Sequence, residues 1–168
     1  MNAAAGNASP VKTAQERLAW ATAACRDARM RLTPVRESIL SFLARQRMPA
    51  TLEMVSHADG VQDHCDATTV YRTLMLFKEA DLVRLVGTPR KLSHFVLNVP
   101  GENNYFLICR RCGCIAEMPL SPPTAIAIQQ VAEAQGFAPT RQDCEVYGLC
   151  ETCQSATRTQ IVPSKLMH

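Results

Sequence analysis

Residues 109–112 read Cys-Arg-Arg-Cys, and residues 150–153 read Cys-Glu-Thr-Cys. Two thiolates separated by two residues can hold one metal ion from a tight turn, and two such pairs supply the four sulfur ligands of a closed tetrahedral zinc site. Two local disulfides or a thioredoxin-like dithiol are the alternatives, although no βαβ pattern precedes the pairs, which argues against the dithiol. We predict one structural zinc ion per chain, bound by Cys109, Cys112, Cys150 and Cys153.

The composition is that of a folded protein with one domain or two small ones. The chain has 168 residues, of which 47% are hydrophobic and 20% charged. Eight cysteines would also suit a secreted disulfide framework, but residues 1–12 contain no apolar run that could act as a signal peptide. No stretch approaches the ~20 apolar residues that cross a bilayer. We therefore expect a cytoplasmic protein with no membrane partner.

The positive charge is concentrated in the front half of the chain. Residues 1–99 contain 13 Lys and Arg against 9 Asp and Glu, a net charge of +4, whereas residues 100–168 contain 5 against 6, a net charge of −1. A basic front half beside a metal-bound back half fits a nucleic-acid reader joined to an assembly domain.

Helix signals dominate the front half. Thr33 and Pro34 are typical of an N-cap and a first helical residue, and Thr51 and Asp66 are further N-caps. Together with apolar spacings of three and four, these signals predict helices at about residues 13–30, 34–48, 52–57 and 66–79. Extended segments at 82–86 and 95–99, joined by a polar turn, predict a β-hairpin. Helices followed by a hairpin are the layout of a winged helix-turn-helix.

The back half is predicted to contain strands around the cysteine pairs and one helix. The strands are expected at about 105–109, 115–118 and 140–147, and a helix with Ile126, Ile128 and Val131 is expected between Pro122 and Gly136.

The fourth predicted helix carries the candidate DNA contacts. Val70, Leu74 and Phe77 define its buried face, so the side chains of the first two turns that point elsewhere are available to DNA. An arginine can bind guanine or phosphate, a tyrosine can contact a thymine methyl group, and hydroxyls with free backbone N–H groups at a helix start suit phosphates. The predicted DNA-binding residues are Thr68, Thr69, Tyr71 and Arg72.

Three stretches resemble the ferric uptake regulator (Fur) family. Residues 32–40, Leu-Thr-Pro-Val-Arg-Glu-Ser-Ile-Leu, are similar to its second helix, and residues 67–74, Ala-Thr-Thr-Val-Tyr-Arg-Thr-Leu, to its recognition helix. Residues 106–113 and 147–153 are similar to its zinc knuckles, and Gly-Leu-Cys-x-x-Cys at 148–153 resembles the zinc-uptake branch more than the iron branch. The resemblance implies a homodimeric, metal-responsive repressor that binds a double-stranded DNA operator, with Tyr71 and Arg72 as its DNA-contacting pair.

The fold class implied is α+β, an N-terminal winged helix-turn-helix followed by a small α/β dimerisation domain with the four-cysteine zinc site. We expect a flexible N-terminus at 1–12, the DNA-binding domain at 13–99, the dimerisation and zinc-binding domain at 100–155, and a flexible tail at 156–168.

The chain departs from the family at the hinge between the two domains, where the regulatory metal binds. The segment before the first knuckle, Glu-Asn-Asn-Tyr-Phe at 102–106, has no histidine. A reduced hinge site on His94, Glu102 and Glu117 is one interpretation, and a surface histidine with solvated carboxylates is the other. Cys114 and Cys144 are either small buried apolar residues or thiols that respond to oxidation.

Three functions follow from these patterns. The first is a zinc-stabilised repressor that responds to zinc or another divalent metal. The second keeps the fold but binds DNA constitutively or responds to oxidation. The third, a zinc or thiol enzyme acting on a small organic substrate, is disfavoured because four thiolate ligands leave no open position for a substrate. We expect no enzymatic activity and no small organic substrate.

Overall fold

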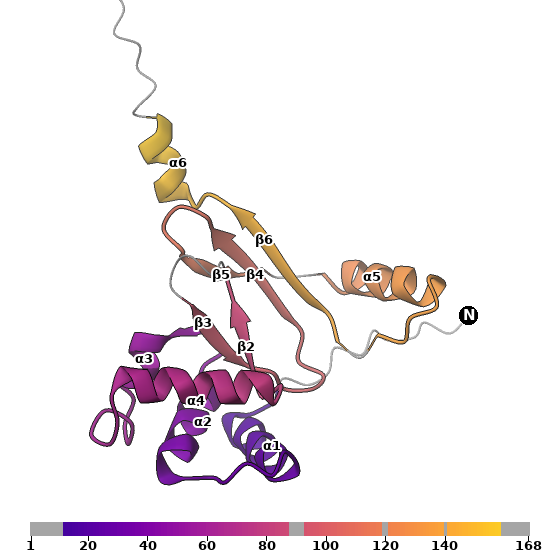
Figure 1. Ribbon diagram of the computed structural model, residues 1–168. Coiled ribbons are helices and arrows are strands. Elements are labelled where there is room, and N and C mark those ends of the chain that lie inside the picture. Colours follow the sequence, from indigo (N-terminus) through magenta and orange to yellow (C-terminus); the bar gives the residue numbers. More distant parts are fainter. Residues whose placement is uncertain (1–11, 88–92, 119–120, 140, 159–168) are drawn as a thin grey trace, which may run out of the picture.

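The computed structural model describes residues 12–87, 93–118, 121–139 and 141–158. Four helices with a small sheet form the first half of the chain, and a second sheet with two helices forms the rest (Figure 1). This arrangement confirms the predicted α+β fold class. None of the described helices is both long enough and apolar enough to cross a membrane.

Three of the four helices of the first half begin at the predicted caps, and the first begins after Thr13, near its predicted start. The four helices are α1 (Ala14–Asp27), α2 (Pro34–Arg45), α3 (Leu52–Ser56) and α4 (Ala67–Glu79). The side chains of Thr13, Thr33, Thr51 and Asp66 each accept a hydrogen bond from a backbone N–H of the first turn that follows. Such a bond satisfies an N–H group that has no partner within the helix. Short-range sequence signals therefore set where each helix starts.

A three-stranded antiparallel sheet completes the winged helix. The strands β2 (Val83–Val86) and β3 (His94–Leu97) form the predicted hairpin, and β1 (Ala50–Thr51) joins β3 in the order β1-β3-β2. The sequence analysis missed β1, because two residues are too short to show a strand pattern. The turn predicted between β2 and β3 at Thr88, Pro89 and Arg90 lies outside the described residues.

The main core lies between these helices and this sheet. Val70, Leu74 and Phe77 of α4 are fully buried, which confirms its predicted inner face. They pack with Ile39, Leu40 and Leu43 of α2 and with Phe95 and Leu97 of β3. The opposite side of α4 therefore faces away from the core.

The second sheet contains both parallel and antiparallel pairs. Its strands are β4 (Asn104–Cys109), β5 (Ile115–Glu117) and β6 (Asp143–Gly148), in the order β5-β4-β6. Strand β4 is antiparallel to β5 and parallel to β6. The helix α5 (Pro122–Ala134) lies in the connection from β5 to β6, and α6 (Glu151–Arg158) follows β6.

One face of the second sheet packs against the β2–β3 hairpin, which is the wing of the winged helix. Phe106 and Ile108 of β4 are buried together with Val86 of β2 and Val96 of β3. Because side chains alternate across a strand, the residue between them, Leu107, points to the other face and is 42% exposed. The two halves of the chain thus share a small apolar interface, and the far face of the sheet is open.

Two regions differ from the sequence expectations. Helix α6 extends to Arg158, so residues 156–158 are helical rather than part of a flexible tail, and residues 159–168 lie outside the described residues. At the other end, residues 1–11 lie outside the described residues, whereas Lys12 donates a hydrogen bond of 2.6 Å to the carbonyl oxygen of Pro100. The domain boundaries otherwise stay a prediction.

Candidate functional site

The predicted DNA-contacting residues lie on one exposed surface of α4. Thr68, Thr69, Tyr71 and Arg72 are all exposed, and the Tyr71 side chain is 45% exposed. They occupy the first two turns, on the side away from Val70, Leu74 and Phe77. The helix is held by its buried face, so the exposed face is presented as a rigid surface.

The start of α4 is less open to phosphate than the sequence suggested. The backbone N–H of Thr69 donates to the Asp66 carboxylate at 2.7 Å. Hydrogen bonds from Thr69 hold the pKa of Asp66 below its ordinary value of 3.8, so the carboxylate is negatively charged at neutral pH. This charge repels phosphate, so the predicted contact through free N–H groups is weakened and the side chains of Thr68, Tyr71 and Arg72 become the main candidates.

The cysteines gather at the edge of the second sheet. The sulfur atoms of Cys109, Cys112, Cys114 and Cys150 lie within 4.8 Å of one another. Those of Cys112 and Cys150 are 3.7 Å apart. Tetrahedral zinc–sulfur bonds of about 2.3 Å place neighbouring sulfurs about 3.8 Å apart, so this spacing fits a zinc ion. Among the described residues no other group of three or more potential ligands is this close.

Backbone N–H groups favour the thiolate form of Cys109. The N–H of Cys150 points at the sulfur of Cys109 at 3.4 Å. The N–H groups of Cys112 and Cys150 lower the pKa of Cys109 to about 5. A thiolate is the form that binds metal, so this environment suits a metal ligand.

The fourth predicted ligand, Cys153, lies in the first turn of α6 and is 8% exposed. Burial and hydrogen bonds involving Cys150, Cys112 and Cys109 raise the pKa of Cys153 to about 12. Cys153 is therefore in contact with three of the clustered cysteines. Cys114 is one of the four whose sulfur atoms lie within 4.8 Å of one another, and hydrogen bonds with Cys112 and Cys150 raise its pKa to about 12 as well. The interpretation of Cys114 as a buried apolar residue is wrong, because its side chain is exposed. Cys144 lies on β6 and is half-buried.

The candidate hinge ligands do not form a cluster. His94 is half-buried at the start of β3, and Glu117 is exposed on β5. Glu102 instead forms an ion pair of 3.2 Å with Arg17, a 5% exposed residue of α1. Arg17 also donates to the carbonyl oxygens of Ala44 and Gln46. In this arrangement Glu102 connects the segment between β3 and β4 to α1, and a hinge metal site on these three residues stays a prediction.

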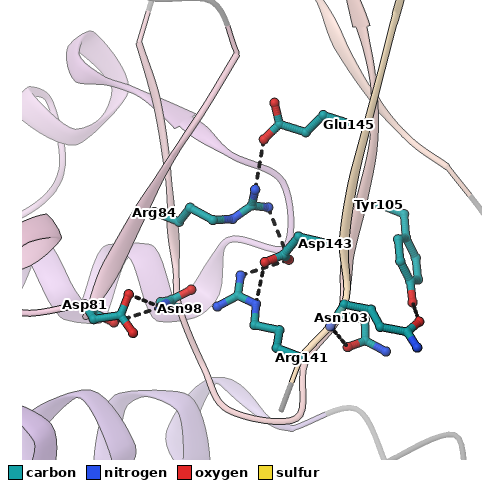
Figure 2. A network of polar contacts seen from close by, with 9 residues as sticks. Asp81, Arg84, Asn98, Asn103, Tyr105, Arg141, Asp143 and Glu145 are labelled. Atoms are coloured by element: carbon teal, nitrogen blue, oxygen red, sulfur yellow. Dashed lines mark hydrogen bonds and ion pairs between the residues drawn. The ribbon is translucent and has the colours of Figure 1, made fainter. Parts of the chain in front are cut away.

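A network of charged side chains connects the wing to the second sheet (Figure 2). Arg84 of β2 reaches across to two carboxylates of β6, Glu145 at 2.8 Å and Asp143 at 3.5 Å. Arg141 contacts Asp143 at 2.7 Å from the other side. The Arg84 guanidinium also lies 6.0 Å from the centre of the Phe106 ring.

The sequence analysis did not single out this network. Asp143 and Glu145 are two residues apart and thus share one face of β6, which is the only sequence signal. Their partner is 61 positions away from Glu145 in the chain, so the contact itself could not be predicted.

Comparisons with known proteins agree with this architecture. The model of the Ferric uptake regulator family matches residues 27–147. The peroxide-responsive repressor PerR of Staphylococcus aureus is 27% identical over 146 residues, which are 86% of this chain and 96% of that protein. Its name refers to peroxide, so membership of the zinc-uptake branch stays a prediction.

Solved structures show the same fold. The ferric uptake regulator Fur of Helicobacter pylori, which has three functional metal-binding sites, aligns with a TM-score of 0.64 and 19% identity over 85% of this chain and 95% of that chain. The ferric uptake regulator of Pseudomonas aeruginosa with manganese aligns with a TM-score of 0.62 and 20% identity, over 77% of this chain and 97% of that chain. Since the family model covers well over half of the sequence, the chain belongs to the Ferric uptake regulator family of transcriptional regulators.

Proposed function

We propose that this protein is a homodimeric repressor that binds double-stranded operator DNA through α4 and is stabilised by one structural zinc ion per chain. The observation that carries the proposal is the surface of α4, where Thr68, Tyr71 and Arg72 are exposed on a helix whose opposite face is fully buried. A helix fixed in this way can enter the major groove without losing the packing that orients it.

Tyr71 and Arg72 offer complementary contacts to DNA. A guanidinium can bind the O6 and N7 atoms of guanine or a phosphate, and a tyrosine can pack on a thymine methyl group while its hydroxyl reaches a phosphate. The two side chains lie about 100° apart around α4, both on its exposed side. The β2-β3 hairpin lies beside α4, as the wing does in winged-helix proteins (Figure 1).

The open face of the second sheet supports a homodimer. Leu107 is the register partner of both Ala116 and Val146, so these three side chains form a row on the face away from the wing. Leu107 is 42% exposed and Val146 45% exposed. An apolar pocket of about 310 Å³ lies along this face. Contiguous apolar surface of this kind marks a protein–protein contact.

Helix α5 supports the same conclusion. The predicted apolar residues of α5, Ile126, Ile128 and Val131, are between 42% and 64% exposed. The helix stands away from the other elements of the chain (Figure 1). A second copy of the chain would cover it. Each fully covered aliphatic side chain stabilises the contact by about 1.5–3 kcal/mol at most.

The remaining parts of the proposal follow from the zinc cluster. Four thiolate ligands close the coordination sphere, so the zinc has a structural role and no enzymatic activity is expected. The site of action is the cytoplasm, where a reducing environment keeps the cysteines available to the metal.

DNA binding is tested with Arg72→Ala and Tyr71→Ala, using operator fragments selected from a random DNA library by the unmutated protein. Each substitution should weaken specific binding by about 1–3 kcal/mol or more, while sedimentation shows an intact dimer. The matched control is Lys78→Ala, which removes a positive charge from the last turn of the same helix. Equal losses for Lys78→Ala and Arg72→Ala would mean that only net charge matters and that α4 does not read bases.

Dimerisation is tested with Leu107→Asp, which introduces a charge on the open face of the second sheet. We expect monomers in sedimentation equilibrium, because an unpaired buried carboxylate opposes association. Leu76→Asp is the control, since Leu76 is 41% exposed on α4, which is not part of the second sheet. Dimers of both variants with equal dissociation constants would contradict the proposed interface.

A second candidate function is DNA binding without a metal signal. It is supported by the separation of His94, Glu102 and Glu117, and by the ion pairs of Arg84, which connect the two halves without a metal ion. The two candidates differ in one measurement, operator affinity with a mild chelator and with added zinc. Equal affinity, with the tight zinc still bound, supports the second candidate, whereas zinc-dependent affinity supports the first.

A further inference from the structure

Five thiols, one more than zinc requires, lie at the proposed metal site. Cys109, Cys112 and Cys114 come from the β4–β5 turn, and Cys150 and Cys153 come from the start of α6. The four mutually close sulfurs include Cys114, which the C-x-x-C pattern does not predict, and leave out Cys153, which it does.

The backbone fixes the position of Cys114. The N–H of Cys109 donates to the carbonyl of Cys114 at 2.9 Å, and the N–H of Gly113 donates to the carbonyl of Cys109 at 2.9 Å. Ile108 and Ile115 are the preceding register pair, so Cys109 and Cys114 are the next opposite pair of the hairpin. Side chains of an opposite pair point to the same side of a sheet. Cys114 therefore faces the cluster because of the strand pairing, whatever the rotation of its side chain.

The turn that permits this pairing is built around Gly113. Its φ angle is +79°, a left-handed conformation that residues with side chains adopt rarely. The chain reverses there within a few residues, and this reversal brings the third cysteine of Cys-Arg-Arg-Cys-Gly-Cys back beside the first.

Zinc in a closed site takes four thiolates, so the fifth thiol must be a spare. We propose that Cys114 and Cys153 are interchangeable as the fourth ligand of the zinc ion, with Cys109, Cys112 and Cys150 as its constant ligands. In the exchange the Cys114 thiol loses its proton and forms a zinc–sulfur bond, the bond to Cys153 breaks, and the Cys153 sulfur takes up a proton. No oxidant takes part, and the charge of the site is unchanged.

The exchange would change what holds α6. With Cys153 bound, zinc holds both ends of the first turn of α6, whereas with Cys114 bound three of the four ligands belong to the β4–β5 turn and only Cys150 holds the helix. Zinc would then remain bound while α6 moves, because the metal no longer depends on Cys153. The inference rests on the proposed zinc site but on neither DNA binding nor dimerisation.

The test compares Cys114→Ser, Cys153→Ser and the double variant in the full-length protein. Zinc per chain is measured by elemental analysis after equilibration with chelators of graded strength, and cobalt(II) is substituted to count thiolates from the visible charge-transfer band. Each single variant should keep one tight metal ion with a four-thiolate spectrum. The double variant should bind zinc more weakly by on the order of 100-fold or more, because one of four bonds is lost. Cys144→Ser, which lies outside the cluster, is the matched control.

The outcomes separate this inference from the zinc site itself. No tight zinc in the unmutated protein overturns the proposed site. A second outcome is one tight zinc in the unmutated protein but weak zinc binding in either single variant, as in the double variant. That outcome overturns only the interchange of Cys114 and Cys153. Tight zinc in the double variant also overturns it, since the fourth ligand must then come from elsewhere.

A measurement on the unmutated protein avoids the risk that a variant fails to fold. Alkylation of individual cysteines is followed by mass spectrometry with zinc bound and after its removal. Cys114 is exposed, so the reagent reaches it in the metal-free protein, and a bond to zinc would protect it. We expect zinc to slow alkylation of Cys114, and an unchanged rate at Cys114 overturns the inference.

Discussion

Arg84 is the residue whose removal should loosen the wing from the second sheet. Its guanidinium contacts Glu145 at 2.8 Å and Asp143 at 3.5 Å. The Arg84 side chain is only 21% exposed, and the side chains of Glu145 and Asp143 are exposed to a similar extent. Replacing it with methionine keeps an unbranched side chain over Phe106 but removes the charge, so the change isolates the ion pairs from the apolar contact.

The expected cost follows from the burial of the pair. Hydrogen bonds to charged groups contribute about 1.5–3 kcal/mol, whereas fully exposed ion pairs contribute about 0.2–1 kcal/mol. Arg84 lies nearer the buried limit, but Asp143 keeps Arg141 as a partner when Arg84 is lost. We therefore expect Arg84→Met to lower the free energy of unfolding by about 2 kcal/mol, within the range of these values.

A double-mutant cycle measures the contact itself. Arg84→Met and Glu145→Gln are combined, and unfolding by urea gives the free energy of each variant. The coupling energy should be about 1–2 kcal/mol, in the range found for residues in direct contact. The control cycle pairs Arg84→Met with Glu133→Gln, because Glu133 contacts Gln129 on exposed α5. The control cycle should be additive. If the effects of Arg84→Met and Glu145→Gln on the free energy of unfolding also add to within about 0.5 kcal/mol, the proposed contact is refuted.

The remaining predictions concern the core, the acid limit and the metal. Leu74→Ala should lower the free energy of unfolding by about 2–5 kcal/mol in urea titrations, because Leu74 is fully buried and its removal leaves a cavity. A smaller loss would mean that neighbouring side chains move to fill the cavity. Hydrogen bonds from Thr69 lower the pKa of Asp66 in the folded state, so its contribution to stability is complete above its ordinary value of 3.8 and is lost as the pH falls through the folded-state value. Asp66→Asn, which keeps a capping side chain, should therefore unfold with less acid dependence than the unmutated protein, and parallel pH profiles would contradict this. Cys109→Ser should remove the tight zinc and unfold the second half of the chain, as seen by elemental analysis and circular dichroism, because metal binding contributes directly to folding; Cys144→Ser should do neither.

Local sequence patterns determined most of the elements and the pieces of the candidate site. The caps Thr33, Thr51 and Asp66 start their helices where the sequence predicts, because capping involves residues only two or three positions apart. Thr13 caps the helix that was predicted to begin at about residue 13. The apolar spacing of α4 identified both its buried side and, by exclusion, the exposed surface proposed to bind DNA. The repeated C-x-x-C pattern identified Cys109, Cys112 and Cys150, three of the four clustered cysteines, for the same reason, since each pair lies within one short segment.

Pairing over long distances in the chain was decided only by the tertiary structure. The contact of Arg84 with Glu145 depends on how the wing packs against the second sheet, and no local pattern records that packing. Cys114 joins the thiol cluster because β4 and β5 pair in a particular register, and Glu102 faces Arg17 because the segment between β3 and β4 lies beside α1. Helix α5 shows the reverse case: the sequence predicts the helix and its apolar residues, but apolar residues alone cannot tell whether the surface that covers them belongs to the same chain or to another.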